Sequence, residues 1–230
     1  MNRTNILFLF LVASALFLSC GGNTASPLQG EGDTIPMRYA KNITMVRYGD
    51  NVVEVKLKNP WGEGLLGSYV LMEGPNSQLS TLNSQFSDGN SQPIHVPLKN
   101  ALVFTAVHCG LICELGMEQS IGGVCEKEYI HGLTKEVVDC GNGMSPNQER
   151  IIQLHPDAML VSPFESNTGH DKLGQLGIPI VECAEYMEPT ALGRAEWMKF
   201  YGLLLGKEKE ANAMFDALVA RYDSLSALVK

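Results

Sequence analysis

The chain has 230 residues, of which 45% are hydrophobic and 18% are charged, and its formal net charge is −8. This composition is typical of a folded globular protein, and the length allows one or two domains, so the sequence excludes wholesale disorder. The excess of acidic residues argues against nucleic acid and against an anionic membrane surface as partners.

The first twenty residues have the pattern of a secretory signal. Arg3 precedes an apolar run over Ile6–Leu18, which is too short to span a membrane as a helix. The run ends in Leu-Ser-Cys-Gly, where Cys20 resembles the lipid-modified cysteine of a bacterial lipobox. We therefore expect a lipoprotein signal peptide over 1–20 and a flexible, Gly-rich and Ser-rich tether over 21–39. An ordinary signal peptide with an incidental cysteine is the alternative.

Residues 40–97 have a β pattern. Apolar and charged residues alternate along 53–58, and Gly49-Asp50-Asn51 is a turn signal, so Ile43 to Lys58 is predicted to be a hairpin. Ser68 to Met72 is predicted to add a strand. Most of 73–97 is rich in Ser, Asn, Gln, Gly and Pro and is interpreted as loop. We interpret the whole as a β-rich accessory segment.

From residue 98 to 206 short apolar runs alternate with helical patterns, which indicates an α/β lobe with a largely parallel sheet and covering helices. The runs over 101–107, 120–125, 137–140, 158–161 and 179–183 are predicted strands. The predicted helices are 109–115, 170–176 and 191–205, together with one in the stretch described next.

The stretch Met144–Ser162 predicts a capped helix followed by a buried strand. Ser145 and Gln148 have the spacing of a capping box, with Pro146 at the first helical position. The helix is expected to end at His155, because the residue before a proline is pushed out of the helical region.

The last helix is predicted over 208–230. It carries an apolar stripe at spacings of three and four residues and would be roughly 34 Å long at 1.5 Å per residue. The members of the stripe are Ala211, Met214, Phe215, Leu218, Val219, Tyr222, Leu225 and Leu228.

Five of the six cysteines follow Cys20, and an odd number leaves at least one thiol unpaired. No pair has the CxxC spacing of a zinc or redox site, so packed or unpaired cysteines are favoured over a metal cluster.

From residue 98 to the end, the chain resembles the substrate-binding lipoproteins of ABC importers for ferric siderophores, haem and cobalamin. The most specific motif is P-N-x-E-x-I-x-x-L-x-P-D over 146–157, followed by L-G-I-P-I-V and G-R-A-E-W-M-K-F-Y-G-L-L-L-G. The β-rich segment and the run around Gly193–Trp197 resemble the branch common in Bacteroides-like bacteria.

This family has two α/β lobes joined by one long helix, with the ligand held between the lobes. The resemblance implies that residues 98–206 are the first lobe and 207–230 the bridging helix, with the second lobe missing. Either the chain is truncated or a single lobe is used differently. It also implies a non-enzymatic receptor without a cofactor, lipid-anchored in the cell envelope on the periplasmic side. That receptor would deliver an iron complex or cobalamin to an ABC permease.

The resemblance places ligand contacts in the loops at the carboxyl ends of the strands, as the rule for open α/β sheets also expects. A plain loop role is the alternative for each residue. The candidate ligand-binding residues are His108, Lys127, Tyr129, Asn142, Met144, Glu165 and Asn167. Glu149 occupies the family's permease-docking position, where a carboxylate in a first helical turn could meet arginines.

Three other functions compete with the importer receptor. A zinc or manganese receptor of related fold would need converging histidines, and the downstream histidines give no ligand pair by spacing. A half-receptor could be a nonfunctional remnant. A hydrolase would use Cys109 beside His108, although no orienting acid is evident.

Trp197 and Phe200 are expected in the core, and Arg194 and Glu196 are expected in structural ion pairs.

Overall fold

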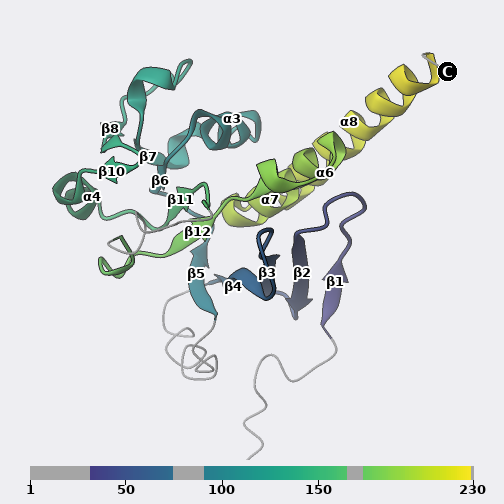
Figure 1. Cartoon of the computed structure of the whole chain (residues 1–230), viewed down its shortest axis with the longest axis horizontal. Coiled ribbons are helices and arrows are strands. Elements are labelled where there is room, and N and C mark those ends of the chain that lie inside the picture. Colours follow the sequence, from purple (N-terminus) through teal and green to yellow (C-terminus); the bar gives the residue numbers. More distant parts are fainter. Residues whose placement is uncertain (1–31, 75–90, 165–172, 229–230) are drawn as a thin grey trace, which may run out of the picture.

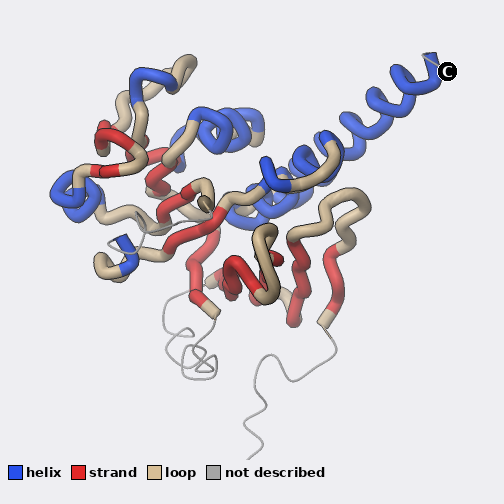
Figure 2. The backbone as a smooth tube through the Cα atoms, in the orientation of Figure 1, coloured by secondary structure: helices blue, strands red, loops and turns tan. Residues whose placement is uncertain are grey.

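The computed structural model describes residues 32–74, 91–164 and 173–228. The strands of the described part form two five-stranded sheets, which Figure 2 shows as two groups of red segments with the helices alongside, and one two-stranded sheet. One cluster of buried apolar side chains runs through both, from Val55 in the first sheet to Leu160 in the second and Phe200 in a helix. The two sheets therefore share one core.

The N-terminal sheet confirms the predicted hairpin. Its strands are β1 (Asp33–Ile35), β2 (Ile43–Tyr48), β3 (Val52–Lys58), β4 (Leu65–Glu73) and β5 (Gln92–Val96). They lie in the order β1-β2-β3-β4-β5, and every neighbouring pair is antiparallel except β4 and β5.

The interpretation of residues 73–97 as mostly loop is wrong at its end, because β5 is a strand. Ile94 and Val96 of β5 are buried while His95 is exposed, and β5 pairs in parallel with β4. A five-residue run that begins with Gln and Pro has little β signal of its own, so the pairing with a partner earlier in the chain decides its state.

The second sheet is parallel, as predicted. Its strands are β6 (Ala101–Val103), β7 (Ile121–Val124), β8 (Val138–Asp139), β11 (Met159–Val161) and β12 (Ile180–Glu182). They lie in the order β12-β11-β6-β7-β8, and every neighbouring pair is parallel. Every residue of β6 and β11 is buried, as expected for strands covered on both faces.

Two helices that accompany the parallel sheet begin at positions that differ from the prediction. The strand expected over 101–107 ends at Val103, and α3 (Ala106–Glu114) begins three residues later because Thr105 Oγ1 accepts the N–H of His108. The cap of α4 (Gln148–Leu154) is Asn147, whose Oδ1 accepts the N–H of Arg150.

The predicted capping box of α4 is therefore wrong. Ser145 and Pro146 form a short strand, β10, which pairs with β9 (Gly141–Asn142), and this pairing holds Ser145 outside the helix. The predicted end of the helix is confirmed, since His155 is its left-handed C-cap residue with a φ of 48°.

The helix expected over 191–205 is divided at Trp197 into α6 (Ala191–Glu196) and α7 (Met198–Leu205). The indole N–H of Trp197 donates to the Glu188 carboxylate at 3.0 Å. Trp197 and Phe200 are fully buried, which confirms their predicted place in the core.

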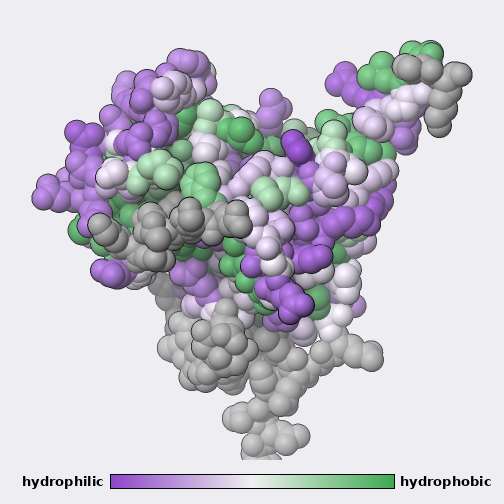
Figure 3. Space-filling model, in the orientation of Figure 1, coloured by the Kyte–Doolittle hydropathy of each residue, from purple (hydrophilic) through white to green (hydrophobic). Residues whose placement is uncertain are grey.

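The long C-terminal helix is confirmed as α8 (Glu208–Leu228). Its first half packs on α7, where a Cβ added at Gly202 would lie 2.6 Å from the Cβ of Ala211. Its second half projects from the body of the protein (Figure 1), and apolar side chains lie exposed on that projecting end (Figure 3). Leu225 is 64% exposed and Leu228 is 83% exposed.

Two buried carboxylates attach the N-terminal sheet to the helices. Glu196 accepts the N–H groups of Arg38, Tyr39 and Ala40 at 2.7–2.9 Å, and it pairs with Lys199 Nζ at 2.8 Å. Glu188 accepts the N–H groups of residues 41 and 42. The expected structural ion pair of Glu196 is confirmed, whereas Arg194 donates to the backbone carbonyl of Glu188 at 3.0 Å.

Candidate functional site

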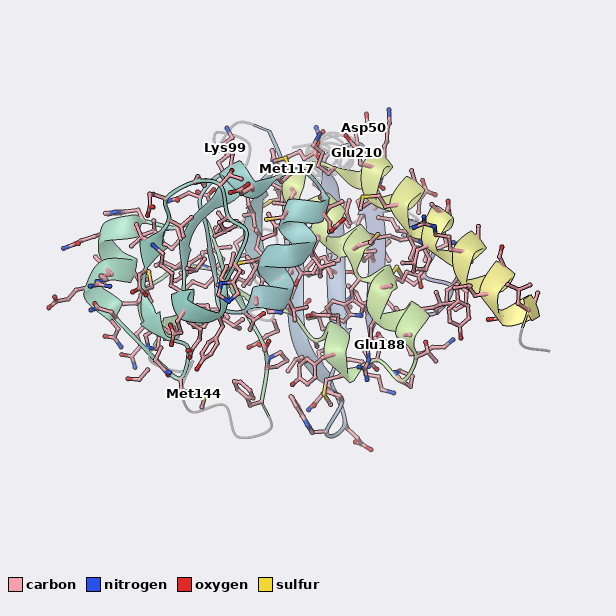
Figure 4. All side chains as sticks on the ribbon, turned by 90° about the horizontal axis from the view of Figure 1, so that it is seen from above. Asp50, Lys99, Met117, Met144, Glu188 and Glu210 are labelled. Carbon is pink, nitrogen blue, oxygen red and sulfur yellow. The ribbon has the colours of Figure 1, made fainter. Side chains whose placement is uncertain are left out.

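The carboxyl ends of the central parallel strands meet at one edge of the second sheet. Figure 4 shows Met144 at this edge and Lys99, which precedes β6, at the opposite edge of the molecule. Phe104 and Thr105 follow β6, Glu126 follows β7 after one residue, and Ser162 follows β11. The connections after β6, β7 and β11, together with the segment that carries Met144, therefore bring residues that are distant in sequence to one place.

A hollow of about 140 Å³ opens at this edge, and we call it the carboxyl-edge hollow. Its lining is mainly apolar, with two hydroxyl groups and one carboxylate. The residues that line it are Phe104, Thr105, Glu126, Gly143, Met144, Ser162 and Phe164. Apolar walls with a few placed polar groups are the usual composition of a small-molecule site.

The tight turn between β9 and β10 presents Met144 to the hollow. Asn142 Oδ1 accepts the N–H of Met144 at 2.9 Å, and Gly141 has a φ of 85°, which a residue with a side chain rarely adopts. Met144 is 67% exposed. Of the seven candidate ligand-binding residues, Met144 lies in the hollow and Asn142 shapes the turn that carries it.

Glu126, which also lines the hollow, is held in a strained backbone conformation. It has a φ of 55° and a ψ of 43°, a left-handed conformation that is uncommon for residues other than glycine. Its N–H donates to the Gly141 carbonyl at 2.8 Å, and its Oε1 accepts the N–H of Gly143, also at 2.8 Å. Strained residues of this kind concentrate at functional sites.

Four further candidates do not line the hollow or fall outside the described residues. Lys127 Nζ contacts the Val137 carbonyl at 3.3 Å and the Glu136 carboxylate at 3.5 Å, and Tyr129 is 68% exposed. Glu165 and Asn167 fall within 165–172, outside the described part of the chain.

His108 lies on α3 in the interior, where its ring contacts the turn η5 (Glu185–Met187). The ring is fully buried, and its Nε2 lies 3.1 Å from Oε1 of the buried Glu185. Its neighbour Cys109 is also buried, and burial raises the pKa of that thiol to about 12. A nucleophilic cysteine needs a lowered pKa, so this environment is opposite to the one required by the hydrolase hypothesis.

Glu149 is exposed in the first turn of α4, where its side chain faces solvent. The cysteines at 109, 113, 125, 140 and 183 are all free thiols. Within the described residues, no group of three or more His, Cys, Asp and Glu side chains is placed to hold a metal ion.

Sequence reasoning selected the edge of the sheet at which the hollow lies, but it named only part of the lining. The seven candidate residues did not include Phe104, Thr105, Glu126, Ser162 or Phe164. Their common signal is position, since each lies within three residues after a parallel strand.

Among the described helices, none combines the length and the apolar character needed to cross a membrane.

Comparison with known proteins places these features in a family. An uncharacterized lipoprotein of Methanocaldococcus jannaschii is 25% identical over 213 residues, which cover 84% of this chain and 51% of the relative. A second uncharacterized lipoprotein of that organism is 28% identical over 213 residues, covering 83% and 51%. The chain thus spans about half the length of the curated relatives it matches.

Solved structures also align with part of the chain. A possible iron-binding periplasmic solute-binding protein from Staphylococcus epidermidis aligns with a TM-score of 0.49 and 19% identity, over 58% of this chain and 52% of the other. A siderophore-binding protein from Vibrio cholerae, solved with Fe³⁺-Desferal, aligns with a TM-score of 0.44 and 24% identity, over 56% and 50%. The family described as "Periplasmic binding protein" matches residues 108–230, more than half of the chain, and the chain belongs to that family.

Proposed function

We propose that this protein is the substrate-binding component of an ABC importer, and that it captures an iron complex, either a ferric siderophore or haem, or cobalamin. Membership of the periplasmic binding protein family supports a binding function rather than an enzymatic one. The observation that carries the proposal is the carboxyl-edge hollow, where apolar walls and a few polar groups lie at the position at which open α/β sheets bind ligands.

In this proposal residues 98–206 are the ligand-binding lobe, 207–230 are the bridging helix, and 40–97 are an accessory segment. Met144 and Asn142 act at the hollow and Tyr129 and Lys127 at its periphery, whereas His108 packs in the interior against Glu185. Glu165 and Asn167 would add contacts from the loop after β11. Membership of the Bacteroides-like branch stays a prediction.

A titration with three ligand classes tests the proposal. The chain would be titrated with ferrioxamine B, haem and cobalamin to millimolar concentration, with intrinsic fluorescence or calorimetry as the readout. Met144→Arg should weaken binding at least tenfold, because an arginine side chain would fill the hollow and could reach the Glu126 carboxylate. Ile152→Arg is the matched control, since Ile152 is 51% exposed on α4 and does not line the hollow.

Saturable binding of one class that Met144→Arg weakens and Ile152→Arg leaves unchanged supports the proposal. If none of the three classes binds at millimolar concentration, or if both variants weaken binding equally, the proposed site is wrong.

We further propose that Glu149 docks on arginines of the permease, since its exposed carboxylate is available for a bidentate pair. Glu149→Lys should reduce association with the transporter in detergent or nanodiscs by at least tenfold. Glu114→Lys reverses an exposed glutamate at the end of α3 and should leave association unchanged. Equal association of both variants would refute the docking role.

Relatives named as lipoproteins support lipid attachment at Cys20, so we place the protein in the cell envelope, anchored by its lipid on the periplasmic side.

A further inference from the structure

The lining of the carboxyl-edge hollow carries charge of one sign. Among the described residues that line it, Glu126 alone is ionisable, and the others are aromatic, aliphatic, hydroxylic or glycine. A charged group beside an apolar surface acts in a lower effective dielectric than bulk water, so its field on a bound ligand is strengthened.

The carboxylate of Glu126 is positioned but only partly satisfied. Gly143 donates its N–H to Oε1 at 2.8 Å, and a Cβ added at Gly143 would lie 3.5 Å from the same oxygen. That distance is an ordinary van der Waals contact, so the hydrogen bond from Gly143 is what positions the carboxylate. No described residue donates to Oε2, so this oxygen is available to a donor or a cationic group of a ligand.

Two basic side chains on neighbouring elements form their described contacts with other groups. Lys127 directs its ammonium group to the Val137 carbonyl and the Glu136 carboxylate. Arg150 on α4 donates to the Asp139 carbonyl at 2.6 Å and lies 3.7 Å from the carboxylate of the same residue. Both basic side chains are engaged with residues 136–139, and neither lines the hollow.

We propose that Glu126 is a specificity-determining residue, and that the hollow accepts the neutral or cationic part of a ligand and rejects an anionic one. The predicted substrate class is a neutral or positively charged metal complex, such as a hydroxamate chelate or a corrinoid. A ferric complex that presents carboxylates, and haem through its propionates, would be disfavoured at this surface. The inference rests on the proposed function in one respect: it takes the hollow as the ligand site.

Three isosteric fragments of different charge test the proposal without a metal complex. Benzamidinium, benzamide and benzoate carry charges of +1, 0 and −1 on the same ring, and one ring is small enough for the hollow. The chain, labelled with ¹³C at the methionine methyl groups, would be titrated with each, and the Met144 resonance gives the dissociation constant. Met45 is fully buried in the N-terminal sheet and is the internal reference.

We expect benzamidinium to bind about three- to tenfold more tightly than benzamide, and benzoate to bind more weakly than benzamide by a similar factor. Glu126→Gln should bring all three constants within about twofold. Glu128→Gln is the matched control, because this exposed glutamate belongs to the same turn and does not line the hollow, so the charge preference should persist.

Equal binding of the three fragments to the unaltered chain overturns the proposal, and so does a charge preference that survives Glu126→Gln. Absence of any shift at Met144 with all three fragments overturns it as well. The proposed function fails separately, through the titration with ferrioxamine, haem and cobalamin. If the metal complexes bind at Met144 but the three fragments show no charge preference, the proposed function stands and the inference about Glu126 is wrong.

Discussion

Glu196 holds the N-terminal sheet on the helical layer, and its replacement by glutamine should strongly destabilise the protein. The carboxylate is fully buried and accepts four hydrogen bonds, three from the backbone N–H groups of residues 38–40 and one from Lys199. Burial by itself raises the pKa of Glu196, but the hydrogen bonds from Lys199 and from the backbone lower it overall. The ionised form is therefore the one that the fold stabilises.

Glutamine retains one acceptor oxygen and replaces the other by an amide donor. At least one backbone N–H then loses its partner, and the ammonium group of Lys199, which is 7% exposed, loses its counter-charge. Breaking a buried pair by removing one partner costs about 3–5 kcal/mol, and we expect Glu196→Gln to lower the free energy of unfolding by that amount.

Urea denaturation followed by tryptophan fluorescence measures this loss, since Trp197 lies beside Glu196. Asp216→Asn is the matched control: it removes an exposed ion pair with Arg38, and such surface pairs contribute little. A double variant, Glu196→Gln with Lys199→Met, should recover part of the loss because it also removes the uncompensated charge. A cost below about 1 kcal/mol for Glu196→Gln, or one equal to that of Asp216→Asn, would refute the reasoning.

Three further predictions concern pH, backbone strain and lipid attachment. Burial raises the pKa of Glu182 to about 7, so its contribution to stability is complete below pH 4.5 and is lost as pH rises through 7. Glu182→Gln should therefore gain about 2–3 kcal/mol on the unaltered chain between pH 4 and pH 8, and a pH-independent difference in urea denaturation would contradict this. His155→Gly should stabilise the protein by about 0.5–1 kcal/mol, because glycine adopts the left-handed C-cap conformation without strain, whereas His155→Ala should give no such gain. Equal melting temperatures of the glycine variant and the unaltered chain would refute the strain at this residue. Cys20→Ser should abolish incorporation of labelled palmitate and release the protein from the membrane fraction, and continued labelling would exclude this cysteine as the lipid site.

The parallel sheet and the long helix α8 could be predicted from the sequence because their signals are local. Buried parallel strands are short apolar runs, and the stripe of α8 repeats over 21 residues. β5 could not be predicted in this way, because its partner β4 lies earlier in the chain and decides its state. The cap of α4 was placed two residues early, because the pairing of β10 with β9 competes for Ser145.

The site was harder to predict than the fold, since its geometry depends on contacts between distant segments. The edge of the sheet followed from the rule that open α/β sheets bind ligands at the carboxyl ends of their strands, but the place of Glu126 depends on its left-handed backbone and on its hydrogen bond with Gly143. His108 follows a parallel strand, as a ligand residue would, and the helical start at Ala106 turns its ring into the core. Likewise, the contacts of Glu196 with residues 38–40 span 156–158 positions in sequence, a distance at which no local pattern is informative.

Paramagnetic broadening by iron tests most directly whether the carboxyl-edge hollow binds an iron complex. The methionine methyl spectrum would be recorded with ferrioxamine B, or with ferric haem, and with the corresponding diamagnetic gallium complex. The account predicts that the iron complex broadens the Met144 resonance, while that of Met117 at the opposite edge (Figure 4) stays sharp. The gallium complex should shift the Met144 resonance without broadening it. Broadening centred on Met117, uniform broadening of all methyl groups, or no broadening at millimolar concentration would contradict the central claim.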